Sequence, residues 1–470
     1  MDDWFCDPLI RRGEVYLSLA DALEQAVRNG RLRPGARLPT HRSLSKRLGV
    51  AVSTVTRAYA EAARRGLIES TVGRGTFVRA GAGTQGAVRR EGLRPLERLY
   101  LPLIQHGDAI NLSLNQPLAA GAGERLRTAL AELAASAALD DLARYQPPQG
   151  RPEHRAAGAA WLRLLGVEAR PDEVFAVSGG QTALMTIFLA LARPGDTVLT
   201  EELTWPGALS VGRLTGIRLA PVTLDHEGLA PDAFEEACRI YRPRLVYTMP
   251  TLHNPTTATA SEGRRKDIAR IARAHNVLIV EDDAYGFLIE PRATSYWQLA
   301  PDITVYLTSL SKPIAPALRV GFMAAPPRLL KPLRAAMRAT TVMVSPLLLE
   351  LAARLIDSGA GREAAAAQAA AARRRQQLVA AVLGHQPRAT SLHYWLRLPP
   401  DMRTAGFVAD ALANGVAVTP GDAFAVTPGH DPGGVRLCLC AEPDQDRVEQ
   451  GLRVLARLLH ADYAAALPVV

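Results

Sequence analysis

The 470-residue chain contains little cysteine and no segment typical of a secreted or membrane protein. We expect neither a disulfide framework nor a metal site, because only four scattered thiols are present and no further ligands accompany them, namely Cys6, Cys238, Cys438 and Cys440. The acidic start lacks the apolar core of a signal peptide, and no run of about 18 apolar residues indicates a membrane span. We therefore expect a cytoplasmic protein with no membrane partner.

Lysine is equally scarce, because only four of the 55 basic side chains are lysines. One of the four, Lys312, follows Ser309 and Ser311 and is followed by Arg319. A lysine amine can lose its proton and attack an aldehyde, which a guanidinium cannot do. Hydroxyl groups before the amine and an arginine after it suit a phosphate next to that aldehyde. The combination predicts pyridoxal 5'-phosphate (PLP) on Lys312, whereas the tetrapeptide alone also suits a surface lysine in a serine-rich loop.

Motifs that precede this lysine favour the cofactor site. Gly179, Gly180 and Gln181 follow an apolar run and open a helical pattern, where backbone amides can close on an anion. Trp205, taken alone, suits core packing as well as a cofactor ring. The apolar run over 277–280 ends in carboxylates, and a carboxylate at a strand end can hold a pyridine nitrogen protonated.

In this order, Gly-Gly-Gln, Thr-Trp-Pro, Asn-Pro, Asp-x-x-Tyr and Ser-x-Ser-Lys resemble the fold-type I aminotransferases, from about residue 108 to the C-terminus. The resemblance implies that Lys312 forms the internal aldimine and that Asp282 pairs with the pyridine nitrogen. It also implies that Tyr285 and Asn254 hydrogen-bond the ring hydroxyl and that Trp205 stacks on the ring. The phosphate would be held by Gly179, Gly180, Gln181, Ser309, Ser311 and Arg319.

Two more positions carry the resemblance beyond this set. Tyr145 matches the tyrosine that reaches the phosphate from the partner subunit, so we expect a homodimer. Arg436 matches the arginine that grips the α-carboxylate of an amino acid with two hydrogen bonds. Thr257 departs from the pattern, because the asparagine motif usually runs on to glycine.

The positive charge of the chain is concentrated near its N-terminus. The net charge is +9, and residues 28–79 alone hold twelve basic side chains against Glu61 and Glu69. The remainder of the chain is therefore nearly neutral. A local basic patch of this kind is typical of a protein that binds the phosphate backbone of nucleic acid.

The same region has the pattern of a winged helix-turn-helix. Amphipathic and capping signals predict helices over 15–27, 43–48 and 53–64, followed by a two-stranded wing over 69–72 and 76–79. In such a unit the second helix of the motif lies in the major groove of double-stranded DNA.

The strings Pro-Gly-Ala-Arg-Leu-Pro-Thr from residue 34 and Gly-x-Gly-Thr-Phe-Val from residue 73 resemble the GntR family of regulators. Relatives often have Ser-Arg where this chain has Ala51-Val52, so we expect one base or phosphate contact to be missing there. The resemblance implies that DNA is contacted by Arg42, Ser53, Thr54, Thr56, Arg57, Arg74 and Gly75.

The two parts together resemble the MocR subfamily of GntR regulators over nearly the full length. We expect a DNA-binding domain over 8–80, a linker over 81–107 and an aminotransferase-like effector domain over 108–470. Alternating strand and helix patterns over 173–323 predict an α/β fold, with a mostly parallel sheet covered by helices on both faces. The segment from about residue 329 predicts a smaller α+β subdomain that carries Arg436.

Two functions are compatible with the sequence. In the first, a transcriptional regulator binds operator DNA and senses PLP, or an amino acid or amine that forms an external aldimine. In the second, the chain is a PLP-dependent aminotransferase that acts on an α-amino acid. The complete DNA-binding pattern favours the regulator, and the complete set of cofactor motifs leaves residual transaminase activity open.

Overall fold

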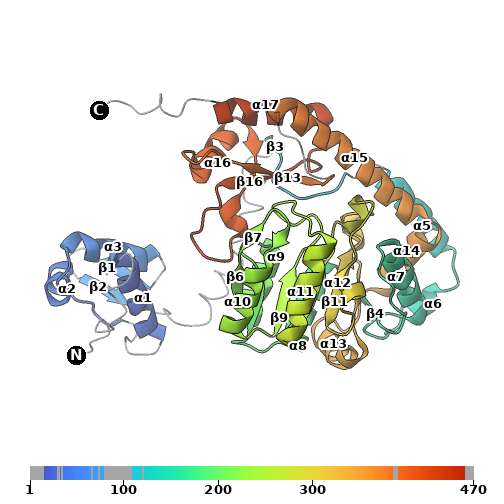
Figure 1. The fold of residues 1–470 in the computed structure, drawn as a ribbon, viewed down its shortest axis with the longest axis horizontal. Coiled ribbons are helices and arrows are strands. Elements are labelled where there is room, and N and C mark those ends of the chain that lie inside the picture. The colour runs from blue at the N-terminus through green and yellow to red at the C-terminus, as the bar shows by residue number, and fades with distance from the viewer. Residues whose placement is uncertain are drawn as a thin grey trace. The chain divides into compact units, whose positions relative to one another are not determined.

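The computed structural model describes residues 15–28, 32, 35–64, 67–71, 75–78, 108–118, 121–384 and 390–460. The chain divides into two compact units, Met1–Leu93 and Arg94–Val470, which are described separately (Figure 1). The predicted linker at 81–107 lies outside the described residues, as does Arg74. Within the described ranges, no helix is long and apolar enough to cross a membrane.

The first unit contains three helices and a β-hairpin. Its elements are α1 (Val15–Arg28), α2 (His41–Leu48), α3 (Val52–Arg64), β1 (Ile68–Thr71) and β2 (Gly75–Val78), and the two strands pair antiparallel. Thr40 caps α2, because its side chain accepts a hydrogen bond from the backbone N–H of Ser43 over 3.3 Å. Gly49 ends α2 in the left-handed conformation. The predicted winged helix-turn-helix is confirmed.

The second unit is built on a seven-stranded sheet in the order β4-β12-β11-β10-β9-β5-β6. All neighbouring strands pair parallel except β12, which is antiparallel to both β11 and β4. The strands are β4 (Val174–Val177), β5 (Thr197–Glu201), β6 (Arg218–Val222), β9 (Leu245–Thr248), β10 (Leu278–Asp282), β11 (Thr304–Ser309) and β12 (Gly321–Ala324).

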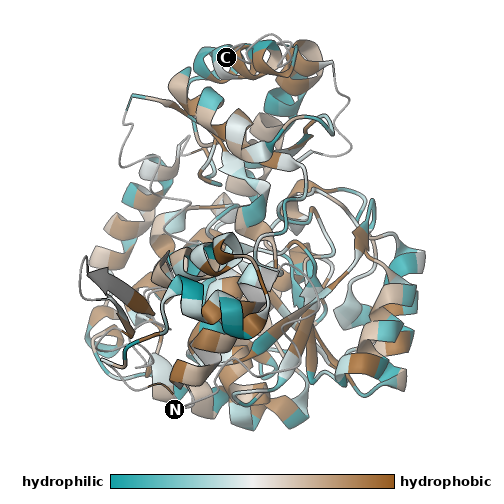
Figure 2. Ribbon diagram, turned by 90° about the vertical axis from the view of Figure 1, so that its left-hand side faces the viewer, coloured by the Kyte–Doolittle hydropathy of each residue, from teal (hydrophilic) through white to brown (hydrophobic). Residues whose placement is uncertain are grey.

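Helices cover both faces of this sheet, as predicted. Val280 on β10 packs in one apolar cluster with Leu184 of α8, whereas its neighbour Ile279 packs in another with Ile268 of α11. Hydrophobic and hydrophilic residues alternate along the helices (Figure 2), as expected where one helix face packs on a sheet. The helices are α7 (Pro152–Leu164), α8 (Gly180–Leu191), α9 (Pro206–Thr215), α10 (Pro231–Tyr241), α11 (Glu262–Ala274), α12 (Tyr296–Leu299), α13 (Pro327–Thr340) and α14 (Pro346–Asp357), with α5 (Ala122–Ala134), α6 (Leu139–Leu142) and the short turns η2 (Gly286–Leu288) and η3 (Pro316–Leu318).

A smaller α+β subdomain carries a second sheet, in the order β13-β16-β15, with antiparallel pairing. The short strand β3 (Ile110–Asn111) also belongs to this subdomain, because it pairs parallel with β14 (Val416–Ala417) in a separate two-stranded sheet. The other elements of the smaller subdomain are β13 (His393–Arg397), α16 (Thr404–Ala413), β15 (Thr419–Pro420), η4 (Gly421–Phe424), β16 (Gly434–Cys438) and α17 (Gln445–His460). The larger part also contains a short hairpin of β7 (Leu224–Asp225) and β8 (Gly228–Leu229).

The predicted start of this subdomain near residue 329 is wrong. Helices α13 and α14 pack against α8 and α7 of the larger sheet, so they belong with that sheet. The link is the long helix α15 (Ala360–Leu383), which contacts η2 in the larger part and α17 in the smaller one (Figure 1). The amphipathic pattern of α13 could not reveal which sheet it covers.

Candidate cofactor site

A cavity of about 360 Å³ lies where the carboxyl ends of the central strands meet. In an open sheet of parallel strands this edge is where ligands bind. Most of the predicted cofactor residues line the cavity, namely Gly180, Gln181, Trp205, Asn254, Asp282, Tyr285, Ser309, Ser311, Lys312 and Arg319, together with Arg436 from the smaller subdomain.

The amine of Lys312 lies in the cavity and donates a hydrogen bond to the backbone carbonyl of Asn115. Its side chain is half-buried and surrounded mostly by protein. Burial lowers the pKa of Lys312 to about 8, and the nearby Arg436 and Arg319 act in the same direction. A substantial fraction of the amine is therefore neutral near physiological pH, as attack on an aldehyde requires.

Asp282 is buried at the end of β10 and accepts a hydrogen bond from the phenol of Tyr247 over 2.7 Å. Burial raises the pKa of Asp282 to about 7, and Asp283 and Glu201 add to this effect. A protonated ring nitrogen beside the carboxyl would supply the missing positive charge and restore the carboxylate. This pocket therefore fits the pyridine end of PLP.

Hydrogen-bond donors that suit a phosphate gather around Ser311 and Arg319, next to the start of α8. Arg319 donates to the hydroxyl of Ser311 over 3.2 Å, and the backbone N–H of Ser311 donates to the hydroxyl of Ser309 over 3.2 Å. Gly179 precedes α8 with a φ of 83°, and a Cβ there would lie 2.5 Å from an Arg319 nitrogen. Glycine is therefore required at this position, although Gly179 does not itself line the cavity.

Arg436, on β16, is buried and oriented from several sides. One Nη donates to Asn254 Oδ1 over 2.9 Å, and the other donates to the carbonyl of Ser113 over 2.7 Å. The ring of Phe424 lies 4.8 Å from the guanidinium carbon. The Nε of Arg436 is buried without a hydrogen-bond partner in the described part of the chain, so a donor remains for a carboxylate.

Threonine stands at position 257, where the resemblance led us to expect glycine in the turn after Asn254. Thr257 adopts a φ of 62°, and its backbone N–H donates to the carbonyl of His253 over 2.7 Å. A β-branched residue in the left-handed region costs roughly 1–2 kcal/mol. The amide oxygen of Asn254 is taken by Arg436, which leaves the amide nitrogen as the donor for a ring hydroxyl.

Four cavity residues were missed by the sequence reasoning: Leu114, Asn115, Met249 and Ala284. Asn115 also donates from its side chain to the phenol oxygen of Tyr285 over 2.8 Å. Tyr247 was missed as well, because it lies inside the apolar strand β9 and belongs to no motif.

Tyr145 does not line the cavity of its own chain, and its side chain is 85% exposed. This placement is compatible with the expected contact to a partner subunit. The role of Tyr145 stays a prediction.

In the first unit, the predicted DNA contacts lie on the surface. Arg42, Ser53, Thr56 and Arg57 are exposed, and Thr54 is half-exposed. The hydroxyl of Thr56 donates to a backbone carbonyl of its own helix over 3.0 Å. The Arg57 guanidinium lies 3.8 Å from the ring centre of Tyr16 on α1.

At the wing, Gly75 has a φ of 116°. A Cβ there would lie 3.0 Å from the Nε of Arg37, which also pairs with Phe77 through an isolated bridge. Arg37 therefore lies beside the wing, a position that the sequence motif did not reveal.

Two family models match the chain. Residues 107–455 match the family "Aminotransferase class I and II", and residues 15–78 match "Bacterial regulatory proteins, gntR family". The chain is 30% identical over 457 residues to the Bacillus subtilis HTH-type transcriptional regulator YdeF, and the match covers 96% of this chain and 96% of the relative. It is also 30% identical over 328 residues to a 2-aminoadipate transaminase of Thermus thermophilus, across 67% of this chain and 81% of the relative.

Solved structures of aminotransferases share the fold. Pyrococcus horikoshii kynurenine aminotransferase in complex with PMP superposes with a TM-score of 0.72 and 26% identity, across 77% of this chain and 93% of its own. The Thermus thermophilus α-aminoadipate aminotransferase LysN, complexed with N-(5'-phosphopyridoxyl)-L-leucine, gives 0.68 and 26%, across 78% and 96%. The cofactor implied by this fold and this pocket is PLP. The chain belongs to the transcriptional regulators that join a GntR-type DNA-binding domain to an aminotransferase class I and II domain, which is the MocR architecture.

Proposed function

We propose that this PLP-dependent regulator binds operator DNA as a homodimer, and that an amino acid bound next to PLP changes its affinity for DNA. The observation that carries the proposal is the meeting of Lys312, Asp282 and Arg436 in one cavity, in a chain that also has a winged helix-turn-helix. The buried Nε of Arg436 has no partner among the described residues, which favours a ligand that carries a carboxylate.

The residues of the cavity suggest a division of roles. PLP, when bound, supplies an aldehyde for amines and a ring that accepts electrons. Lys312 would hold the cofactor covalently, and the lowered pKa of its free amine favours the neutral form that attacks the aldehyde. Asp282 would keep the ring nitrogen protonated, and Arg436 would position the carboxylate of the effector.

Arg436 and Lys312 belong to different subdomains, which supports a conformational role for the effector. Lys312 follows β11 of the larger sheet, whereas Arg436 lies on β16 of the smaller one. An amino acid that contacts both would favour the closest arrangement of the two subdomains. A ligand shifts an equilibrium only through its different affinities for the two states, so this arrangement must also differ in DNA affinity.

The test uses the full-length protein and a DNA fragment selected by it from a random pool. Affinity is measured by fluorescence anisotropy with PLP alone and with each common amino acid, and keto-acid release is measured in parallel. We expect at least one amino acid to change DNA affinity, and Arg436→Leu to abolish that change. Arg397→Leu is the matched control, because Arg397 is an exposed arginine on β13 of the same subdomain.

Fast multiple turnover to a keto acid, with no change in DNA affinity for any amino acid, would overturn the proposal in favour of an aminotransferase. Loss of the response in Arg397→Leu as well as in Arg436→Leu would show that general charge, not the carboxylate site, is responsible.

A further inference from the structure

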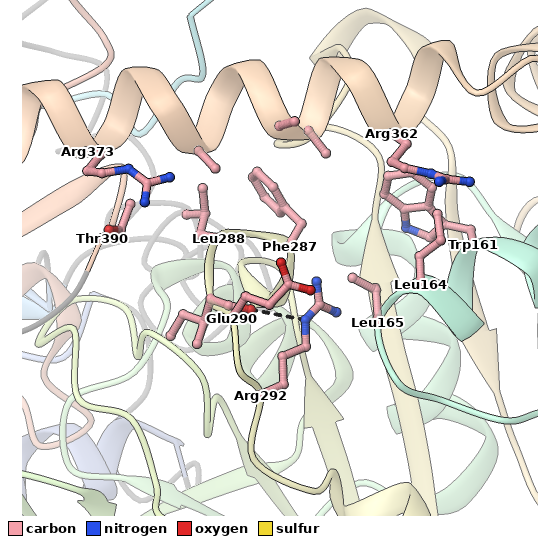
Figure 3. Close-up of a pocket in the computed structure, with 14 residues that line it drawn as sticks. Trp161, Leu164, Leu165, Phe287, Leu288, Glu290, Arg292, Arg362, Arg373 and Thr390 are labelled. Carbon is pink, nitrogen blue, oxygen red and sulfur yellow. Dashed lines mark hydrogen bonds between the residues drawn. The ribbon is translucent and has the colours of Figure 1, made fainter.

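A second cavity, of about 610 Å³, lies between α7, the segment around η2 and α15 (Figure 3). It shares no lining residue with the cofactor cavity. Apolar side chains cover much of its wall, including Leu165 from the end of α7 and Phe287 and Leu288 from η2. An apolar body of small size therefore fits here.

Two buried donors in this wall have no acceptor. The indole Nε1 of Trp161 and one Nη of Arg292 are buried and have no hydrogen-bond partner within the described residues. Trp161 is only 2% exposed. Folded proteins rarely leave such groups unpaired, because each unpaired donor costs roughly 1–3 kcal/mol. Both residues line this cavity, so a ligand bound in it can supply the missing acceptors.

The charges around the cavity favour an anion. Arg362 and Arg373 reach it from α15, and Arg292 reaches it from the segment after η2. Glu290 is the one carboxylate in the lining, and Figure 3 shows it next to Arg292. Arginine and tryptophan side chains can only donate hydrogen bonds, so the ligand has to supply the acceptors.

We propose that this cavity binds a small molecule that carries a carboxylate on an apolar body. The carboxylate accepts hydrogen bonds from Trp161, Arg292 and Arg362, and the apolar body packs on Phe287 and Leu288. The planar guanidinium groups suit a carboxylate because they offer parallel N–H donors.

One short segment of the chain contributes residues to the walls of both cavities. Ala284 and Tyr285 line the cofactor cavity, and Phe287 lines the second cavity two residues later. A ligand that packs on Phe287 would also restrain Tyr285. A ligand bound at this second site could therefore influence the cofactor cavity, and the site is separate from the proposed effector site at Arg436.

The test is calorimetric titration of the full-length, PLP-loaded protein. The probes are hexanoate, phenylacetate and indoleacetate, each compared with its neutral amide. We expect at least one acid to bind about tenfold or more tightly than its amide, because a hydrogen bond to a charged group is lost in the amide. Arg362→Gln should weaken the acid by a similar factor, and Trp161→Phe should weaken it while retaining the ring.

Two further variants make the result decisive. Arg374→Gln is the matched control, because Arg374 is exposed on α15 but does not line the cavity, and we expect unchanged binding. Arg436→Leu should also leave binding unchanged. Binding lost in Arg436→Leu but kept in Arg362→Gln would place the probe in the cofactor cavity and overturn the proposal. So would equal affinity for acid and amide, or no binding of any acid at millimolar concentration.

Discussion

Tyr247 donates its phenolic hydrogen to Asp282 over 2.7 Å, and both side chains are buried, with Asp282 in the wall of the cofactor cavity. Burial and the neighbouring carboxyl raise the pKa of Tyr247 well above its ordinary value, so the phenol keeps the hydrogen that it donates. The bond fixes the orientation of the carboxyl and stabilises its charged form. Tyr247 is thus a positioning residue for the group expected to pair with the ring nitrogen.

Removal of this phenol should weaken the cofactor. Tyr247→Phe is expected to reduce PLP affinity by about tenfold, because a hydrogen bond to a charged group contributes roughly 1.5–3 kcal/mol. Affinity is measured by adding PLP to the apoprotein and following its visible absorption. Tyr306→Phe is the matched control, because Tyr306 donates to Asp283 over 2.6 Å in an equally buried pair outside the cavity lining. Equal losses in both variants would mean that Tyr247 has only a structural role.

Attachment of PLP should depend on pH through Lys312. Burial lowers the pKa of this amine from 10.5 to about 8, and only the neutral amine attacks the aldehyde. The rate of attachment to the apoprotein should therefore rise with pH and level off above about 8. Stopped-flow absorption measures this rate, and Lys312→Ala should show no attachment at any pH. A rate that still rises through pH 10 would contradict the lowered pKa.

The lowered pKa of Lys312 should also make the stability of the apoprotein rise with pH. Between about 8 and 10.5 the unfolded chain holds a proton on Lys312 that the folded apoprotein has lost. The free energy of unfolding of the apoprotein should therefore increase with pH across this window through this group. Lys312→Met should remove that increment, as chemical denaturation at a series of pH values would show.

How far the sequence predicts the site depends on where each residue lies along the chain. Asp282 ends strand β10 and Lys312 follows strand β11, each inside a short motif, so the motifs identified both residues and the order of the strands brings them together. Asn115 has no such motif. It meets Lys312 only because β3, far earlier in the chain, joins the smaller subdomain. Contacts between segments so distant depend on the completed fold, and a single sequence carries no local signal for them.

Thr257 offers a test of backbone strain at the asparagine turn. Thr257→Gly should raise the free energy of unfolding by about 0.5–1 kcal/mol, because relief of the left-handed threonine exceeds the entropy that glycine adds to the unfolded chain. Urea denaturation of the PLP-free protein measures the change. Thr340→Gly, in the ordinary backbone of α13, should instead lower stability. A loss of stability in Thr257→Gly would show that its side-chain bond to the carbonyl of Thr256 outweighs the strain.

DNA binding should depend steeply on salt, because each neutralised phosphate releases counterions and adds a log–log slope of about −0.9. If Arg57 contacts a phosphate, Arg57→Ala should flatten the slope by about one unit. The ring of Tyr16 holds the Arg57 guanidinium at 3.8 Å without adding charge. Tyr16→Leu should therefore weaken binding while leaving the slope unchanged. Arg163→Ala is the control, because Arg163 lies on the second unit and pairs with Glu168. An unchanged slope in Arg57→Ala, together with a lost preference between DNA sequences, would mean that Arg57 contacts a base instead.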